Sequence, residues 1–246
     1  MSKARLDQHL VESGLCESRE RAKRLILAGE VKVDGHVVDK PASGVPADAV
    51  VEVTERPKFV SRAGLKLEGA LDAFGIDPAG RICLDVGAST GGFTDCLLQR
   101  GATMVFAFDV GTNQLAWKLR NDSKVIVREQ FNCRHMEPGD LGGEVPDLAV
   151  TDVSFISLTK ILPAIARVIA PGGEVVALVK PQFELEREQV GKGGVVRDDE
   201  LRRHALEKIV GFATRDLSWE CLGTMDSPVE GATGNREFLS WFRSPR

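Results

Sequence analysis

The strongest constraint on the fold is a regular alternation of short apolar runs with helical stretches, which begins near residue 60. The run at 175–179 is apolar at every position, as expected of a strand that is covered on both faces of a sheet. Strands that alternate with helices are typical of a parallel sheet flanked by helices. Strands are expected at 81–86, 104–109, 124–128, 147–152 and 174–180, with two closing strands near 219–225 and 237–242. With helices expected at 92–99 and 158–169, the pattern predicts an α/β, Rossmann-like domain of seven strands.

The first sixty residues follow a different pattern. Helices are expected at 5–14 and 18–29, each ending on a glycine that suits a helix C-cap. Apolar and polar residues then alternate over 31–38 around Asp34-Gly35, a strong hairpin signal, and a third strand is expected at 49–53. The polar, proline-marked segment 54–58 is typical of a linker. We therefore expect a small α+β domain with its linker over residues 1–58 and the large domain over 59–246.

Composition removes several classes of protein. The formal net charge of −4 disfavours a uniformly basic nucleic-acid binder, so RNA affinity would need local patches. The apolar runs are too short to span a bilayer, and the first residues lack a signal-peptide core. The five cysteines have no CxxC spacing and no histidine at metal-ligand spacing. We therefore expect a cytoplasmic protein with reduced thiols, no bound metal and no membrane partner.

A glycine-rich segment follows the first strand of the large domain. It reads Asp85-Val-Gly87-Ala-Ser89-Thr-Gly91-Gly92-Phe93, and glycines there let the backbone approach a ligand closely. The segment lacks the GxGxxG spacing that holds a pyrophosphate, which disfavours a nicotinamide cofactor. Asp109, at the end of the second strand, is placed to accept hydrogen bonds from the two ribose hydroxyls of a nucleoside. The loop resembles the cofactor motif of Rossmann-type methyltransferases, which implies S-adenosylmethionine as the cofactor.

The N-terminal residues carry a second resemblance. Arg5-Leu-Asp7, Leu10, Gly14-Leu15, Ser18-Arg19 and 31–35 closely resemble the S4 RNA-binding domain. In such a domain a cluster of cations can meet the phosphates along an RNA groove. The expected RNA-binding residues here are Arg5, Arg19, Arg21, Lys23 and Arg24. The alternative is a solvated helix face, because residues 1–60 hold ten basic and ten acidic residues.

Taken together, the motifs resemble one family over essentially the whole chain. They lie at 61–67, 85–93, 151–157, 179–184 and 231–237. With the S4 module they resemble the TlyA family of ribosomal RNA 2′-O-methyltransferases, also called hemolysins, whose catalytic domain is similar to the FtsJ group. The resemblance implies a seven-stranded methyltransferase domain acting on a ribose 2′-hydroxyl, of a cytidine, in ribosomal RNA or ribosomal subunits. It also implies a catalytic tetrad of Lys66, Asp152, Lys180 and Glu237.

The chemistry explains these residue types. A ribose hydroxyl is a poor nucleophile, so it must lose its proton as it attacks an electrophilic methyl group. Lys180 is the expected proton acceptor, with Asp152 and Lys66 as its orienting partners. Glu237 is the expected hydrogen-bond acceptor that positions lysine or ribose. Taken singly, Lys66 could instead face solvent, and Glu237 could form a surface pair with its neighbour Arg236. Arg62 is a weaker candidate for phosphate binding, and 192–194 for a loop that closes over substrate.

The cofactor site and the overall function leave alternatives open. The residues expected to contact the cofactor are Asp85, Gly87, Ser89, Gly91, Gly92, Phe93, Asp109, Asn132 and Asp152. Phe93 could equally pack into the core, which we favour, and Asn132 could be a loop-turn residue. The main competing interpretation is a non-catalytic RNA-binding or ribosome-assembly protein. A cofactor-binding titration distinguishes the two interpretations. A membrane-acting hemolysin would need a spanning or strongly amphipathic basic helix, which the sequence lacks.

Overall fold

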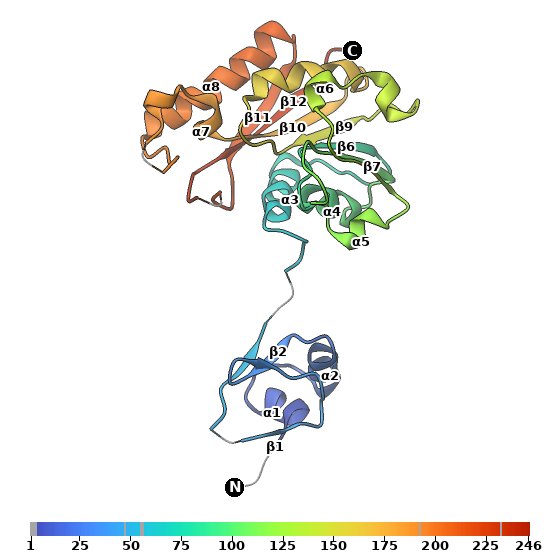
Figure 1. The fold of residues 1–246 in the computed structure, drawn as a ribbon, viewed down its shortest axis with the longest axis vertical. Helices are drawn as coiled ribbons and strands as arrows, with labels where there is room; N and C mark the ends of the chain where they lie inside the picture. Colours follow the sequence, from blue (N-terminus) through green and yellow to red (C-terminus); the bar gives the residue numbers. More distant parts are fainter. Residues whose placement is uncertain (1–3, 47, 55–56, 192, 232) are drawn as a thin grey trace. The chain divides into compact units, whose positions relative to one another are not determined.

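The computed structural model describes residues 4–46, 48–54, 57–191, 193–231 and 233–246. Its contacts divide the chain into two units, Met1–Pro57 and Lys58–Arg246 (Figure 1). Each unit has a hydrophobic core of its own. They are described separately below.

The N-terminal unit packs two helices against short strands. Its elements are β1 (Ala4–Arg5), α1 (Leu6–Glu12), α2 (Arg19–Leu27), β2 (Val31–Val33), β3 (His36–Val37), β4 (Gly44–Val45) and β5 (Val51–Val53). The Ser18 hydroxyl accepts a hydrogen bond from the Arg21 amide and caps α2. The hairpin forms around Asp34-Gly35, and both residues have positive φ, as a tight turn requires. The antiparallel pair of β1 and β4 was not expected from the sequence.

The C-terminal unit is built on a seven-stranded sheet, as predicted. Its strands are β6 (Ile82–Val86), β7 (Met104–Phe108), β8 (Val125–Arg128), β9 (Leu148–Thr151), β10 (Glu174–Val179), β11 (Glu220–Asp226) and β12 (Phe238–Arg243). Their order is β11-β12-β10-β9-β6-β7-β8. The run from β10 to β8 is parallel, and β12 is antiparallel to both of its neighbours. The order reverses between β6 and β9, and ligands bind at the carboxyl ends of strands at such a switch point.

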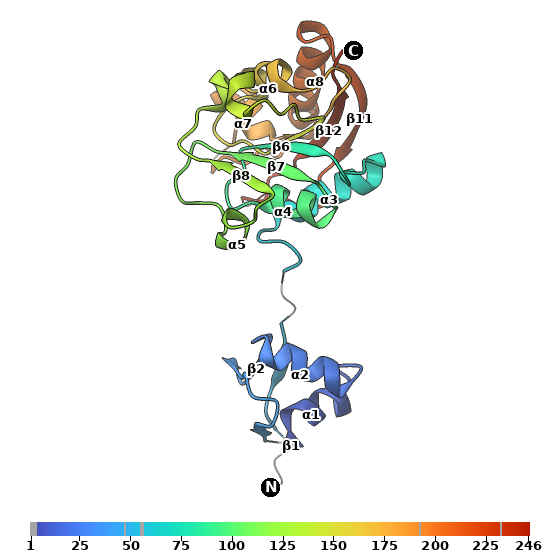
Figure 2. The same cartoon turned by 90° about the vertical axis from the view of Figure 1, so that its right-hand side faces the viewer.

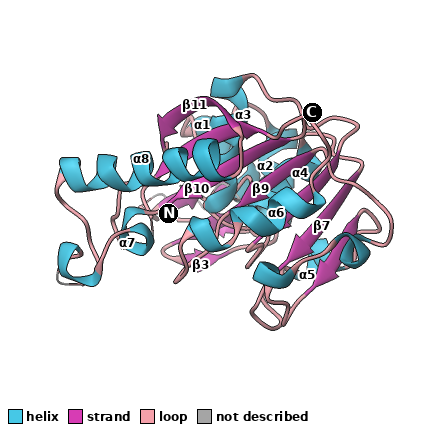
Figure 3. Ribbon diagram, turned by 90° about the horizontal axis from the view of Figure 1, so that it is seen from above, coloured by secondary structure: helices cyan, strands magenta, loops and turns pink. Residues whose placement is uncertain are grey.

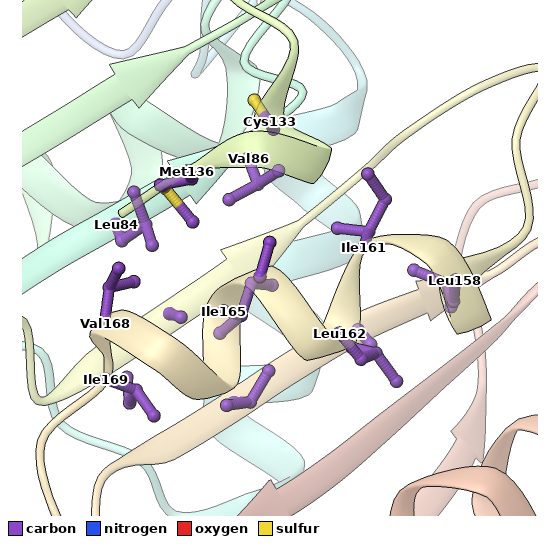
Figure 4. Close-up of a cluster of buried hydrophobic side chains, with 14 of the residues drawn as sticks. Leu84, Val86, Cys133, Met136, Leu158, Ile161, Leu162, Ile165, Val168 and Ile169 are labelled. Carbon is purple, nitrogen blue, oxygen red and sulfur yellow. The ribbon is translucent and has the colours of Figure 1, made fainter. Parts of the chain in front are cut away.

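Helices cover both faces of this sheet. Figures 1 and 2 show α3 (Ala63–Phe74) and α4 (Gly92–Gln99) on one face, with α6 (Leu162–Val168) and α8 (Asp199–Asp216) on the other. In Figure 3, seen from above, α8 and α6 lie across the strands. Successive strand residues alternate between the two cores, so that Leu84 packs with the α6 side and Cys83 with the α3 side. Figure 4 shows the α6 side, where Leu162 and Ile165 meet the strands.

Two helical features differ from the prediction. The helix expected at 158–169 is divided into the 3-10 turn η3 (Leu158–Lys160) and α6, because Pro163 lacks an amide hydrogen and favours the first turn of a new helix. The longest helix, α8, was not predicted. Its fully buried apolar residues are Ala205, Ile209 and Ala213, and Leu206, Val210 and Phe212 pack against the same core. The short helices α5 (Trp117–Arg120) and α7 (Pro181–Glu184) complete the described α-helices.

Candidate functional site

The glycine-rich loop joins β6 to α4 at the switch point of the sheet. Gly87 and Gly91 have φ values of 85° and 94°, and Ser89 has a φ of 48°. A Cβ atom at Gly87 would lie 2.8 Å from the backbone oxygen of Asp152, and one at Gly91 would lie 2.3 Å from Leu119 Cδ1. The loop therefore needs glycine at both positions, for its backbone conformation and for close packing. Gly92 is equally restricted, because a Cβ there would lie 2.3 Å from Ser61 Oγ.

A cavity of 700 Å³ opens on one side of this loop. Asp109 borders it directly after β7, and its carboxylate is fixed by two backbone amides. Asp109 Oδ2 accepts from the Ser89 amide at 2.8 Å, and Oδ1 accepts from the Gly111 amide at 2.6 Å. A carboxylate oxygen can accept more than one hydrogen bond. The group can therefore still accept the two hydroxyls of a ribose.

Asn132 borders the same cavity and is exposed. Its Oδ1 accepts from the Arg134 amide at 3.3 Å and from Arg134 Nε at 3.2 Å. It thereby caps the 3-10 turn η1 (Cys133–His135). The sequence left open whether Asn132 forms a turn or lies at the cofactor site. In the structure it caps the turn and also borders the cavity.

A second cavity of 280 Å³ lies on the other side of the loop. Gly87, Ser89 and Asp152 border both cavities. The small cavity is lined by all four residues of the expected tetrad, Lys66, Asp152, Lys180 and Glu237. Asp152 therefore stands between the space suited to a cofactor and the space that holds the two lysines.

The four side chains come from four separate elements. Asp152 and Lys180 each directly follow one of two adjacent parallel strands, β9 and β10, so both reach the same edge of the sheet. Glu237 directly precedes β12, which pairs with β10. Lys66 lies in the first turn of α3. The strand order thus brings together residues that are far apart in the sequence.

The tetrad forms two ion pairs. Lys180 Nζ lies 2.5 Å from Asp152 Oδ1, and Lys66 Nζ lies 2.5 Å from Glu237 Oε2. The contact between Lys180 and Asp152 Oδ1 is an ion pair whose angles do not meet those of a hydrogen bond. Lys180 Nζ donates its hydrogen bond to Ser154 Oγ at 2.9 Å. Lys66 does not contact Lys180, which it was expected to orient, and instead pairs with Glu237, which was expected to accept a hydrogen bond from lysine or ribose. Lys66 and Glu237 are 7% and 3% exposed, so neither is the surface charge that each could have been when taken alone.

Asp85 does not occupy the place expected of a cofactor contact. It is fully buried and borders neither cavity, and its Oδ2 accepts from Thr94 Oγ1 at 2.6 Å. This bond links the end of β6 to α4 beneath the loop. Burial raises the pKa of the Asp85 carboxyl to about 7. Phe93 is 2% exposed and packs into the core on the α3 side, as favoured, while its edge borders the small cavity.

The basic residues of the N-terminal unit are less free than the sequence suggested. Arg5 and Arg19 each lie 3.0 Å from the carboxylate of Asp7, which is fully buried. Hydrogen bonds from Arg5 and then Arg19 lower the pKa of Asp7 to about 2. The other pairs are Arg21 with Glu17 and Lys23 with Glu20. Arg24 is exposed.

Arg5 and Arg19 are still accessible to solvent although they pair with Asp7. Those of Arg5 and Arg19 remain 48% and 49% exposed. A guanidinium carries five N–H donors, so one carboxylate does not exhaust it. In the other unit, Arg62 is exposed and borders the small cavity.

The sequence reasoning missed two residues beside the tetrad. Ser154 receives the hydrogen bond of Lys180. Phe155 is 90% exposed with a φ of 63°, borders the large cavity and lies 5.1 Å from the ring of Phe183. They lie at the second and third positions after Asp152, and that nearness was the available signal. Of the loop expected at 192–194, Lys192 lies outside the described residues.

Among the described residues, no group of histidine, cysteine and acidic side chains is arranged to hold a metal ion. No described helix is long and apolar enough to cross a membrane.

Comparison with known proteins identifies the family. Residues 59–244 match the FtsJ-like methyltransferases, and residues 4–51 match the S4 domain. The chain is 48% identical to the Mycobacterium tuberculosis 16S/23S rRNA (cytidine-2′-O)-methyltransferase TlyA, over 98% of this chain and 90% of that protein. It is 46% identical to hemolysin A of Brachyspira hyodysenteriae, over 97% of this chain and 99% of the relative.

A solved structure agrees with these sequence relatives. A Streptococcus thermophilus protein called a hemolysin superposes with a TM-score of 0.76 at 46% identity, covering 100% of this chain and 90% of the other. The resemblance drawn from the sequence motifs is confirmed. The chain belongs to the TlyA family, in which an S4 domain is joined to an FtsJ-like methyltransferase domain.

Proposed function

We propose that this protein transfers a methyl group from S-adenosylmethionine to the ribose 2′-hydroxyl of a cytidine in ribosomal RNA. The observation that carries the proposal is the buried Lys66–Glu237 pair beside the half-buried Lys180–Asp152 pair in a small cavity, which shares Asp152 with a larger one. The name of the Mycobacterium tuberculosis relative supports the ribose and the cytidine. The partner is then ribosomal RNA or a ribosomal subunit, and the site of action is the cytoplasm.

The residues around the large cavity fit the proposed cofactor. Asp109 presents a fixed carboxylate suited to a ribose diol, and Asn132 offers an amide suited to a base. Glycine at 87 lets the loop pack directly against the backbone of Asp152, so that both residues border the two cavities. No pyrophosphate-binding spacing is present in the loop. When bound, S-adenosylmethionine supplies an electrophilic methyl group on its sulfonium sulfur.

The residues of the small cavity perform the proton transfer. In its neutral amine form Lys180 accepts the proton of the ribose hydroxyl, and Asp152 and Ser154 contact its nitrogen and hold it in place. The Lys66–Glu237 pair lines the same cavity and positions the ribose. Alignment of the reacting oxygen with the methyl group provides much of the remaining acceleration. These four positions remain proposals for catalytic roles, with Arg62 as a proposed phosphate contact at the cavity.

RNA recognition is assigned to the S4 unit. The guanidinium groups of Arg5 and Arg19 are held by Asp7 with half of each side chain exposed, which presents fixed donors at low conformational cost. Arg21, Lys23 and Arg24 extend the charge along α2. Contacts of this kind with phosphates position a protein on RNA through shape and charge.

Ribose methylation can be mapped directly. The purified chain is incubated with S-adenosylmethionine and unmodified ribosomal subunits, and the RNA is then hydrolysed in alkali, which cannot cleave next to a 2′-O-methylated ribose. The proposal expects a few protected positions at cytidines. Incorporated methyl groups without any protected position would place the methylation on a base. Cofactor binding without methyl incorporation would favour the non-catalytic alternative.

A further inference from the structure

Glu129 is an acid with a largely buried side chain that follows β8 and borders neither cavity. Its carboxylate accepts from three consecutive backbone amides, those of Asn113, Gln114 and Leu115, at 2.8, 2.9 and 3.2 Å. Arg120 Nη2 lies 2.7 Å from the same group. Its side chain is 12% exposed. Glu129 therefore holds the short loop at 113–115 in place through its backbone amides.

That loop forms one wall of the large cavity. Val110, Gly111 and Gln114 border the cavity, and the Gly111 amide donates to Asp109. Asn113 has a φ of 53°, which bends the chain so that the three amides converge on one point. Successive amides that converge in this way form a site for an anion.

The same loop supports the glycine-rich segment. The Ala116 amide donates to the Thr90 oxygen at 3.1 Å, and Leu115 and Leu119 fill the space next to Gly91. The loop thus lies between Asp109 on one side and the glycine-rich segment on the other. A shift of the loop would move both parts of the proposed cofactor site.

We propose that Glu129 is a positioning residue for the nucleoside half of the cofactor, acting through the loop at 110–116. The inference rests on the proposed function, because it takes the large cavity as the cofactor site. Without the carboxylate, three neighbouring amides would lose a shared acceptor, and such groups are costly to leave unpaired away from water. Arg120 in particular, with the loop amides, lowers the pKa of Glu129 to about 2. The acceptor therefore stays ionised throughout the neutral range.

Glu129→Gln tests the proposal. Glutamine keeps the size of the side chain but turns one acceptor oxygen into an NH₂ donor that faces the loop amides. Calorimetry on the full chain should show that Kd for S-adenosylmethionine rises about tenfold, which corresponds to about 1.4 kcal/mol. KM for the cofactor should rise with it, while kcat at saturation stays within about twofold. A Kd within twofold of wild type, or a fall in kcat at unchanged KM, would overturn the proposal.

Comparison of two ligands separates positioning from simple electrostatics. Loss of a negative charge would weaken only the cationic S-adenosylmethionine, whereas a displaced loop weakens S-adenosylhomocysteine equally, because both carry the same nucleoside. Equal losses for the two ligands are expected. A loss confined to the sulfonium ligand would contradict the positioning role.

Two controls keep the result clear. Glu137→Gln makes the same chemical change at an acid that pairs with Arg167 and borders neither cavity, and it should leave both affinities unchanged. If Glu129→Gln does not fold, Glu129→Asp keeps the charge but shortens the reach. Its Kd should rise about threefold with unchanged kcat, and an unchanged Kd would refute the inference. Failure of the wild type to bind the cofactor would instead refute the proposed function.

Discussion

Each unit buries one aspartate completely, and the two are treated in opposite ways. Asp7 in the N-terminal unit contacts two arginines at 3.0 Å, and its pKa is lowered to about 2. Asp85 in the C-terminal unit accepts one hydrogen bond from Thr94, while its Oδ1 has no hydrogen-bond partner in the described structure, and its pKa is raised to about 7. Asp7 holds two partly exposed arginines in place. Burial of the ionised Asp85 carboxylate lowers the stability of the fold near the proposed cofactor loop, and such perturbed groups are common at functional sites.

Replacement of Lys180 should greatly reduce the rate of methyl transfer and leave the affinities for cofactor and RNA unchanged. Lys180→Met keeps the apolar stem but removes the proton acceptor, so turnover should fall by about 10²–10⁴. Kd values for cofactor and RNA should stay close to wild type. Single-turnover methylation and calorimetry measure the two quantities.

Lys118→Met is the matched control for this change. Lys118 pairs with Asp95 and is 56% exposed, outside both cavities. It should methylate as wild type does. Turnover of Lys180→Met at the level of this control would remove Lys180 from the mechanism.

Removal of residues 1–57 tests whether the two units divide the work. The remaining unit keeps both cavities, so cofactor affinity should be unchanged. Loss of several phosphate contacts should lower kcat/KM on ribosomal subunits by about 10² or more at moderate salt. Equal activity of the truncated and full chains would show that the S4 unit is not needed for recognition.

Asp7→Asn removes the carboxylate that holds Arg5 and Arg19. Hydrogen bonds from arginine to a buried carboxylate are lost, which should cost the N-terminal unit about 2–3 kcal/mol. Because the pKa of Asp7 is lowered on folding, its contribution is present above about pH 4 and is lost as the pH falls towards 2. Hydrogen exchange of α1 and α2 in the full chain measures both effects. Protection that is unchanged by the substitution would refute them.

Asp85→Asn should have the smallest effect, with the opposite sign in pH. The pKa of Asp85 is raised on folding, so its ionisation lowers stability progressively from about pH 4 to about pH 7. The variant cannot ionise, and its unfolding free energy should fall less between pH 5 and pH 8 than that of wild type. Denaturant titrations at the two pH values make the comparison. An identical pH dependence in both proteins would contradict the assignment.

The sequence was informative where one pattern recurs along the chain. Apolar runs predicted all seven strands of the large sheet, and the ends of β9 and β10 predicted that Asp152 and Lys180 would meet. The helix α8 was not predicted, although Ala205, Ile209 and Ala213 recur at helical spacing and further apolar residues of the helix pack beside them. Periodicity reports local structure, and such a helix is held by tertiary packing.

The pairings of charged residues were harder to predict. Lys66 and Glu237 are 171 positions apart, and nothing near either residue specifies the other. Arg5 and Arg19 could be recognised as basic, but their joint attachment to Asp7 depends on how α1 packs against α2. The buried position of Asp85 likewise follows from its place in the middle of the sheet and not from its motif. Side-chain partners are thus fixed by the fold as a whole.

The methyl group is expected on a ribose oxygen. The most direct measurement uses ribosomal RNA that carries 2′-deoxyribose at every nucleotide where alkaline mapping places the modification. The deoxy substrate should bind as tightly as normal RNA, because the S4 contacts are unchanged, and it should accept no methyl group. Transfer of methyl to the deoxy nucleotide would contradict the account and place the reaction on the base.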